Sequence, residues 1–169
     1  SKAEQIAKKN KIDFHKRKKY FASSKCSGGN FFKNLAESIP GDYLVYCPCT
    51  SPIIYTSTYN YFFKHFFKNR KKFDSINTVS ELKTFIWKGK KPLNYNFFNP
   101  PNSQGLPGIY KALTFGINII SKDKMIKYKN IVGRKPSFLK LSKNETVDIN
   151  DSLDFELAKL IYKKNQKKL

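Results

Sequence analysis

The chain of 169 residues contains few cysteines, histidines and arginines. Its three cysteines are an odd number, and the pair Cys47 and Cys49 has neither a second Cys pair nor a nearby histidine, so we expect no disulfide framework and no zinc site. It has no run of about 18 apolar residues, which predicts no membrane span, and its polar first ten residues predict no signal peptide. We therefore expect a reduced, cytoplasmic protein.

The scarcity of arginine decides how the net charge of +21 is interpreted. Of the 33 basic residues only three are arginine, namely Arg17, Arg70 and Arg134. Proteins that bind nucleic acids favour arginine for bidentate contacts to phosphate and guanine, whereas lysine here accompanies 15 phenylalanines and many Asn and Ile residues, a bias typical of an AT-rich genome. We expect solvated lysines spread over the surface and no nucleic-acid partner. A basic nucleic-acid binder with one contiguous lysine face is the competing interpretation.

Hydrophobic periodicity and turn residues predict one α/β domain. Its three layers comprise a mixed, mostly parallel sheet with helices on both faces. Helices are expected at 2–10, 30–39, 58–69 and 122–129 and after Asp151, and strands at 12–15, 43–46, 75–82, 115–121 and 136–141. The apolar strand 43–46 is expected to be buried on both faces. The segment at about 85–114, rich in Pro, Gly and aromatic residues, predicts an extended arm.

Open α/β sheets bind ligands at the carboxyl ends of their strands, which makes two loops candidates. The loop 47–52 follows a strand and carries the hydroxyl groups of Thr50 and Ser51. In the segment 147–151, Asp148 and Asn150 stand two residues apart, so that in a strand they would share a face and offer oxygen ligands to Mg²⁺. Ordinary turns and helix capping explain these residues equally well.

A third candidate is basic. Arg17 precedes the small, hydroxyl-rich loop 23–29, which could hold an anionic or amide-bearing ligand. Neither His15 nor His65 has the acid and nucleophile that Ser-His-Asp or Cys-His catalysis requires, and His65 lies in a Phe-rich helix where a structural role is expected.

Five segments, taken in order, match the pattern of one family. Arg17 with Ala22 and Ser24 resembles R-x-x-x-L-A-x-D, residues 44–53 resemble a hydrophobic strand ending in Q-P-T-S-P-L, and residues 102–107 resemble R-Q-D-L-P. Residues 115–119 resemble N-G-x-I-Y-I, and residues 147–158, VDINDSLDFELA, resemble I-D-I-D-T-x-x-D-F-x-x-A most specifically. Together they resemble the acylneuraminate cytidylyltransferase family, the CMP-sialic acid synthetases and their relatives.

The resemblance implies a fold and an activity. The fold would be nucleotide-sugar transferase-like, with 1–169 as a single domain and 85–114 as the dimerisation arm of a homodimer. The activity would be transfer of CMP from CTP to a 2-keto sugar acid, sialic acid or a related nonulosonate, with Mg²⁺ as cofactor and pyrophosphate as the leaving group.

The resemblance also assigns roles by position. Arg17 and Asp148 would be catalytic, and Asp148 with Asn150 would hold the metal. The substrate-binding residues would be Arg17, Cys26, Ser27 and Gly28 on the cytosine, Thr50 and Ser51 on the sugar side, and Gln104 in the arm's sugar pocket.

Two departures from the family pattern bear on activity. The family's loop I-P-A-R-x-G-S-K-x-x-x-x-K-N, which supplies triphosphate contacts, has no counterpart here, so the resemblance implies an N-terminally incomplete domain. Asn150 stands where the family has a second carboxylate, and one negative charge fewer predicts weaker binding of Mg²⁺. The alternative is a non-catalytic relative that keeps the fold, and with it the arm, as a binding or structural module.

Overall fold

The computed structural model describes residues 1–166, in which a mixed four-stranded sheet forms the centre. Its strands are β1 (Tyr43–Tyr46), β2 (Ser75–Glu81), β5 (Lys111–Ser121) and β6 (Pro136–Lys140), in the order β1-β5-β2-β6. β5 runs antiparallel to both of its neighbours, whereas β2 and β6 are parallel. β1, β2 and β6 therefore share one direction, and the prediction of a mixed α/β sheet is confirmed.

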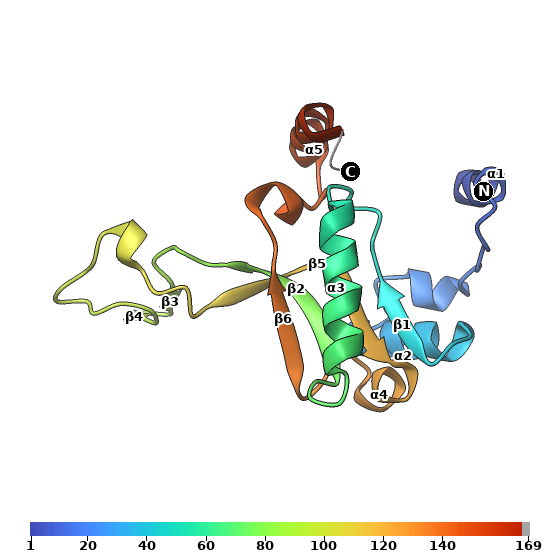
Figure 1. Ribbon diagram of the computed structural model, residues 1–169, viewed down its shortest axis with the longest axis horizontal. Helices are drawn as coiled ribbons and strands as arrows, with labels where there is room; N and C mark the ends of the chain where they lie inside the picture. Colours follow the sequence, from blue (N-terminus) through green and yellow to red (C-terminus); the bar gives the residue numbers. More distant parts are fainter. Residues whose placement is uncertain (167–169) are drawn as a thin grey trace.

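Helices cover both faces of this sheet (Figure 1). On one face α3 (Thr56–Asn69) buries Phe62 and Phe66 against β2 and β5. On the other, α2 (Gly28–Ser38) and α4 (Lys122–Tyr128) bury Ala36 and Met125 against β1 and β5. The side chains of β5 alternate between these two cores, because successive residues of a strand point to opposite faces. Short 3₁₀ turns lie at Lys19–Ala22 (η1), Ser103–Gly105 (η2) and Lys143–Thr146 (η3).

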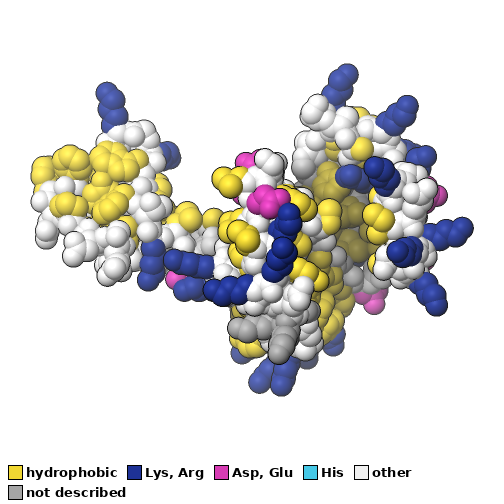
Figure 2. Space-filling view, turned by 90° about the horizontal axis from the view of Figure 1, so that it is seen from above, with side chains coloured by type: hydrophobic (Ala, Val, Ile, Leu, Met, Phe, Trp, Pro, Cys, Tyr) yellow, Lys and Arg dark blue, Asp and Glu magenta, His cyan; other side chains and the backbone are white. Residues whose placement is uncertain are grey.

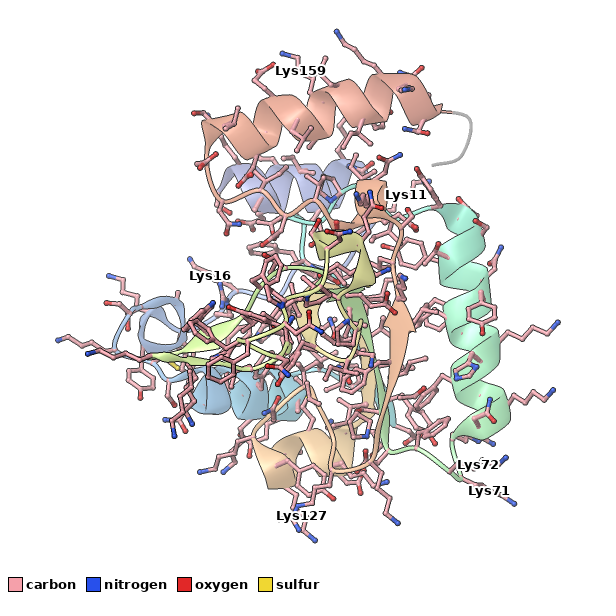
Figure 3. The ribbon with its side chains drawn as sticks, turned by 90° about the vertical axis from the view of Figure 1, so that its left-hand side faces the viewer. Lys11, Lys16, Lys71, Lys72, Lys127 and Lys159 are labelled. Carbon is pink, nitrogen blue, oxygen red and sulfur yellow. The ribbon has the colours of Figure 1, made fainter. Side chains whose placement is uncertain are left out.

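Two further helices lie at the periphery (Figure 1). α1 (Lys2–Lys9) buries no residue, and α5 (Ser152–Asn165) buries only Ala158. Lysines project from well-separated parts of the molecule, among them Lys11 after α1, Lys127 on α4 and Lys159 on α5 (Figure 3). No helix within residues 1–166 is long and apolar enough to cross a membrane.

Three local predictions were wrong. No strand forms at 12–15, where Ile12 is 64% exposed, because these residues pair with no other strand. β1 is not buried on both faces, because Leu44 packs into the core with α2 and α4 whereas Val45, which points to the opposite face, belongs to neither core cluster and is 43% exposed. Helix α2 begins at Gly28 instead of after Asn30, because the hydroxyl of Ser27 accepts a hydrogen bond from the Asn30 N–H at 3.2 Å.

Polar side chains hold β2 and β5 together where their pairing is interrupted. The register shifts between Asn77 and Val79, and Phe115 on β5 has a left-handed φ of 55°. Thr78 fills the gap, because its hydroxyl donates to the carbonyl of Ile117 at 3.1 Å and accepts from the N–H of the same residue at 3.0 Å. Gly116 lies beside it, where an added Cβ would stand 2.9 Å from Ile54 Cδ1 and would require the Ile54 side chain to shift. The core half of β5 is thus fixed by side-chain hydrogen bonds.

The segment after β2 extends away from the sheet (Figure 1). It contains a small hairpin of β3 (Trp87–Lys88) and β4 (Lys91–Pro92) and returns to the sheet at β5. The buried side chain of Asn94 closes its base, accepting from the Ile86 N–H at 2.9 Å and donating to the Thr84 carbonyl at 2.7 Å. Apolar side chains gather over this arm (Figure 2), and Phe98 is 93% exposed. The prediction of an extended segment is confirmed.

We expect Thr78→Val to lower the free energy of unfolding by about 1–3 kcal/mol, because the change leaves the buried N–H and carbonyl of Ile117 without partners. Thr114→Val is the matched control. The Thr114 hydroxyl donates only to Thr78 Oγ1, at 3.1 Å, from a half-buried position, so its loss should cost less. Urea unfolding followed by circular dichroism measures both. Equal losses for the two variants would contradict the role given to Thr78.

Candidate functional site

The loop after β1 and the segment before α5 meet, although about 97 residues separate them in sequence. The N–H of Ile149 donates to the carbonyl of Thr50 at 2.8 Å, and the hydroxyl of Ser51 makes a long hydrogen bond of 3.5 Å to Asp148 Oδ1. Ser51 is buried and Asp148 is half-buried, whereas Thr50 is exposed. The structure therefore brings together two of the three loops that the sequence singles out.

A buried carboxylate positions these two segments. Glu145 in η3 accepts hydrogen bonds from the hydroxyl of Ser142 at 2.7 Å and from the Tyr55 N–H at 3.2 Å. It is 4% exposed, so a single side chain ties the chain before Asp148 to the start of α3. We did not single it out from the sequence, although Ser142 and Glu145 have the three-residue spacing of a capping box, which the structure contains.

Asp148 and Asn150 do point together, as their spacing predicts. Asn150 Nδ2 lies 3.3 Å from Asp148 Oδ2, although the segment is irregular backbone and not the strand that the prediction assumed. Asp151 has a separate role. Its Oδ1 accepts from the N–H groups of Leu153 at 2.9 Å and Asp154 at 3.0 Å, which confirms it as the cap of α5.

Arg17 lies near Tyr46, the last residue of β1. Its guanidinium is 5.1 Å from the centre of the Phe31 ring, which in turn meets the Tyr46 ring edge-on at 6.4 Å. Burial raises the pKa of Tyr46; the positive charge of Arg17 lowers that pKa, and Cys49 and Asp148 raise it further. The charges of both Arg17 and Asp148 therefore act on the phenol of Tyr46. Sequence reasoning missed Tyr46, whose only signal is its place as the last residue of β1.

The remaining predicted residues lie at the start of α2, one helical turn before Phe31, and in the arm. Ser27 is the N-cap of α2, Cys26 Sγ lies 3.4 Å from the carbonyl of Ser27, and Gly28 opens the helix with free space around it. Gln104 is exposed in η2, within the arm and at the other end of the molecule from β1 (Figure 1). A single chain therefore does not bring Gln104 together with Thr50 and Asp148.

The donor atoms at Asp148 and Asn150 fit one kind of metal site. Mg²⁺ is commonly held by one or two carboxylates together with waters and substrate phosphates. Asp148 offers one carboxylate, and Asn150 can turn its amide oxygen toward the same point. Among residues 1–166 no group of three or more His, Cys, Asp and Glu side chains could enclose a metal ion. The pair suits Mg²⁺ that is shared with a bound phosphate.

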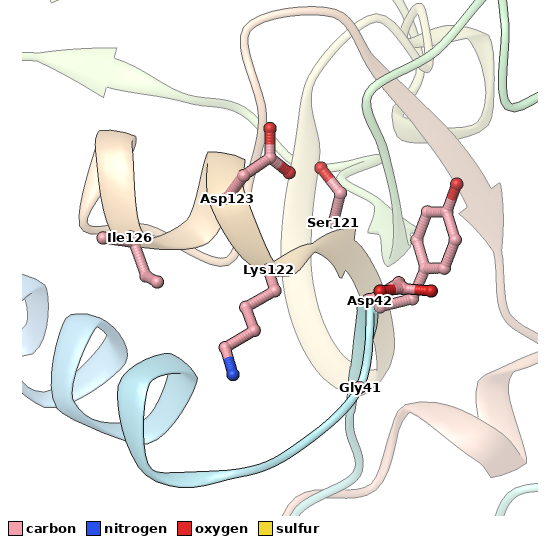
Figure 4. Close-up of a pocket in the computed structure, with 7 residues that line it drawn as sticks. Gly41, Asp42, Ser121, Lys122, Asp123 and Ile126 are labelled. Atoms are coloured by element: carbon pink, nitrogen blue, oxygen red, sulfur yellow. The ribbon is translucent and has the colours of Figure 1, made fainter.

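Two cavities border the core of the fold. An apolar cavity of about 340 Å³ lies under α5, between Ile53, Ile149 and Phe155, and adjoins the candidate site through Cys49. A larger cleft of about 490 Å³ lies at the start of β1, lined by Asp42, Ser121 and other residues (Figure 4). The ammonium group of Lys122 in that cleft donates to the carbonyl of Ile39 at 2.9 Å. This larger cleft contains none of the predicted site residues.

Comparison with known proteins identifies no relative, because no protein-family model matches the chain and no curated protein is significantly similar to it.

Asp151 should contribute more to the stability of the fold than Asp148. We expect Asp151→Ala to lower the free energy of unfolding by about 1 kcal/mol, because two N–H groups of α5 lose their acceptor. Asp148→Asn should stay within about 0.5 kcal/mol of the parent chain, because it retains the shape of the side chain and its hydrogen bonds are long. Urea denaturation measures both. A larger loss of unfolding free energy for Asp148→Asn would indicate that Asp148 has a structural role.

Proposed function

We propose that this chain is the greater part of a cytidylyltransferase that transfers CMP from CTP to a 2-keto sugar acid, sialic acid or a related nonulosonate. The observation that carries the proposal is the contact of Thr50 and Ser51 with Asp148 and Ile149 at the end of β1. These residues belong to the two segments that match the family's strand ending and its most specific pattern. The mixed sheet with helices on both faces is compatible with a nucleotide-sugar transferase-like fold.

In the proposed reaction the anomeric hydroxyl of the sugar acid attacks the α-phosphorus of CTP. A new phosphorus–oxygen bond forms, the bond to the bridging oxygen of the β-phosphate breaks, pyrophosphate leaves and the hydroxyl proton passes to water. Such transfers depend mainly on positioning and charge neutralisation. Mg²⁺, when bound, would neutralise phosphate charge. Asp148 and Asn150 would hold it.

The other residues at this end of the sheet bind and orient the substrates. Arg17 is exposed, and its cation near Phe31 would attract the nucleotide, while the loop at Ser27 and Gly28 would border the cytosine. The exposed hydroxyl of Thr50 would donate to the sugar acid, and Ser51 would orient Asp148. The partly buried phenol of Tyr46 is influenced by the charges of both Arg17 and Asp148 and would border the bound nucleotide.

In this proposal the arm binds a second copy of the chain. Its exposed aromatic side chains would pair with a second copy, and Gln104 would reach the sugar pocket of that copy, because a single chain leaves it remote from Thr50. The three cysteines are all free thiols, which is compatible with a reaction in the cytoplasm.

One observation favours a second candidate function, a non-catalytic binding module with the same fold. Asn150 donates its amide N–H to Asp148 Oδ2 at 3.3 Å, which satisfies by hydrogen bonding a carboxylate that a second Asp would leave to a metal ion. Such a module would bind cytidine nucleotides without turnover.

The test is pyrophosphate release from CTP and Mg²⁺ with a panel of 2-keto sugar acids. We expect release that requires both CTP and one of the acids and that ATP does not support. Asp148→Asn should lower the rate about 100-fold, because the carboxylate that would hold Mg²⁺ against the phosphates is lost. Asp123→Asn, which removes an exposed carboxylate from the other end of the sheet, is the matched control and should have no effect.

Binding of CMP measured in parallel separates the outcomes. Cytidine-selective binding without pyrophosphate release would select the binding module. Neither selective binding nor release would refute both candidates.

A further inference from the structure

A strongly basic groove lies at the opposite end of the sheet from the candidate site. It has a volume of about 350 Å³ and is formed by the chain that leads into β2, the chain that leads into β6, and α4. Because β1, β2 and β6 run in the same direction, the amino ends of β2 and β6 face away from the loop that follows β1. The groove is therefore separate from Thr50 and Asp148.

Six cationic side chains line this groove, namely Arg70, Lys71, Lys72, Lys124, Arg134 and Lys135. They include two of the three arginines of the whole chain, although arginine makes up only three of its 33 basic residues. None of the six forms an ion pair with a carboxylate in the part of the chain that the structure describes. Lys71 and Lys72 project into solvent beyond the end of α3 (Figure 3).

The single carboxylate of the groove, Asp74, is committed to the backbone. Its Oδ2 accepts from the N–H of Arg134 at 2.9 Å and its Oδ1 from the N–H of Lys135 at 2.8 Å. The N–H of Gly133 donates to Ser75 Oγ at 2.8 Å. These bonds fix the loop that carries Arg134 and Lys135, and they leave the side chains of both residues directed to the groove without an acidic partner.

Aromatic rings hold the two arginines in place. The guanidinium carbon of Arg134 lies 5.1 Å from the centre of the Tyr128 ring, and that of Arg70 lies 5.8 Å from the Phe67 ring. The ring of Phe73, which also lines the groove, stacks on His65 at 6.1 Å. Each of these rings already contacts a side chain, and the groove presents mainly cationic groups to a ligand. It is therefore suited to recognise charge.

We propose that this groove binds a chain of linked phosphates, in the form of inorganic polyphosphate or of the triphosphate of a nucleotide. Guanidinium groups form paired hydrogen bonds to phosphate oxygens, and several cations around one concave site reinforce their attraction for an anion. Six cations in a site of about 350 Å³ match a compact ligand with several negative charges better than a single phosphate or an extended strand. The site is independent of the proposed transferase reaction.

Isothermal titration of the full chain with inorganic tripolyphosphate tests this proposal. We expect saturable binding of one molecule per chain that weakens as salt is added, because salt screens the charges. The double variant Arg70→Gln/Arg134→Gln should bind about tenfold or more weakly, since two charge-assisted contacts are lost. An excess of CMP, which lacks linked phosphates, should not displace tripolyphosphate, which separates this result from the proposed transferase site.

Two further variants make the result specific. Lys11→Gln/Lys159→Gln removes the same net charge from α5 and the end of α1, and it should bind tripolyphosphate as the parent chain does. Arg70→Lys/Arg134→Lys keeps the charge and the fold but not the paired geometry, and it should bind with intermediate affinity. Equal losses in the arginine and lysine double variants would overturn the proposal, because net charge alone would then explain binding.

Other ligands distinguish the source of the phosphates. Tighter binding of ATP and CTP alike than of tripolyphosphate would support nucleotide triphosphates, and the reverse order would support inorganic polyphosphate. Absence of tripolyphosphate binding at low salt would overturn the proposal. So would binding of an oligonucleotide or of anionic vesicles that far exceeds that of every compact phosphate and is lost in the arginine double variant.

Discussion

Asn77 and Asn118 face each other between β2 and β5, without contact with solvent, and much of the structure depends on the hydrogen bond between them. Asn77 Nδ2 donates to Asn118 Oδ1 at 3.0 Å and to the carbonyl of Ile131 at 3.2 Å, and Ser75 Oγ donates to Asn77 Oδ1 at 3.1 Å. Both amides are fully buried, so leaving either unpaired would cost the penalty of a desolvated polar group. Together with Thr78 they hold the sheet at its irregular point.

This network also links the candidate site, the basic groove and the arm. Toward the amino end of β2 it continues through Ser75 to the loop of Gly133, and thus to the basic groove. On the amino-terminal side of Phe115, the first residues of β5 connect the sheet to the arm. The core half of β5 pairs with β1, after which Thr50 and Ser51 meet Asp148. The candidate transferase site and the basic groove therefore lie at opposite ends of one sheet, so that the two proposed ligands would bind separately.

Much of this arrangement follows from the sequence, because local patterns determine it. The positions of β2 and β6, the Asp151 cap of α5 and the start of the arm are visible in the residues themselves. The exposure of Val45 is not visible, since it depends on which parts of the sheet the helices cover. The start of β5 at Lys111, four residues before the expected strand, depends on long-range pairing with Glu81.

The candidate site shows the same division. The i, i+2 spacing of Asp148 and Asn150 correctly predicts that they point together, but the contact with Ser51 arises through Glu145, whose partner Tyr55 is 90 residues away. The sequence also does not show that Arg70 and Arg134 line one groove. The two residues are 64 positions apart, and only folding brings them together. The composition predicts dispersed charge, whereas the structure places two of the three arginines in one groove.

The central claim is that the loop after β1 and the segment before α5 form one cytidine-nucleotide site. The most direct measurement is a nuclear magnetic resonance titration of the ¹⁵N-labelled chain with CMP, which lacks the linked phosphates that the groove is proposed to bind. The account predicts that the backbone amide signals of Thr50, Ser51, Asp148 and Asn150 shift together along one saturation curve, while those of Arg134 and Lys135 remain unchanged. Shifts confined to the groove, or a titration that moves no signal in either segment, would contradict it.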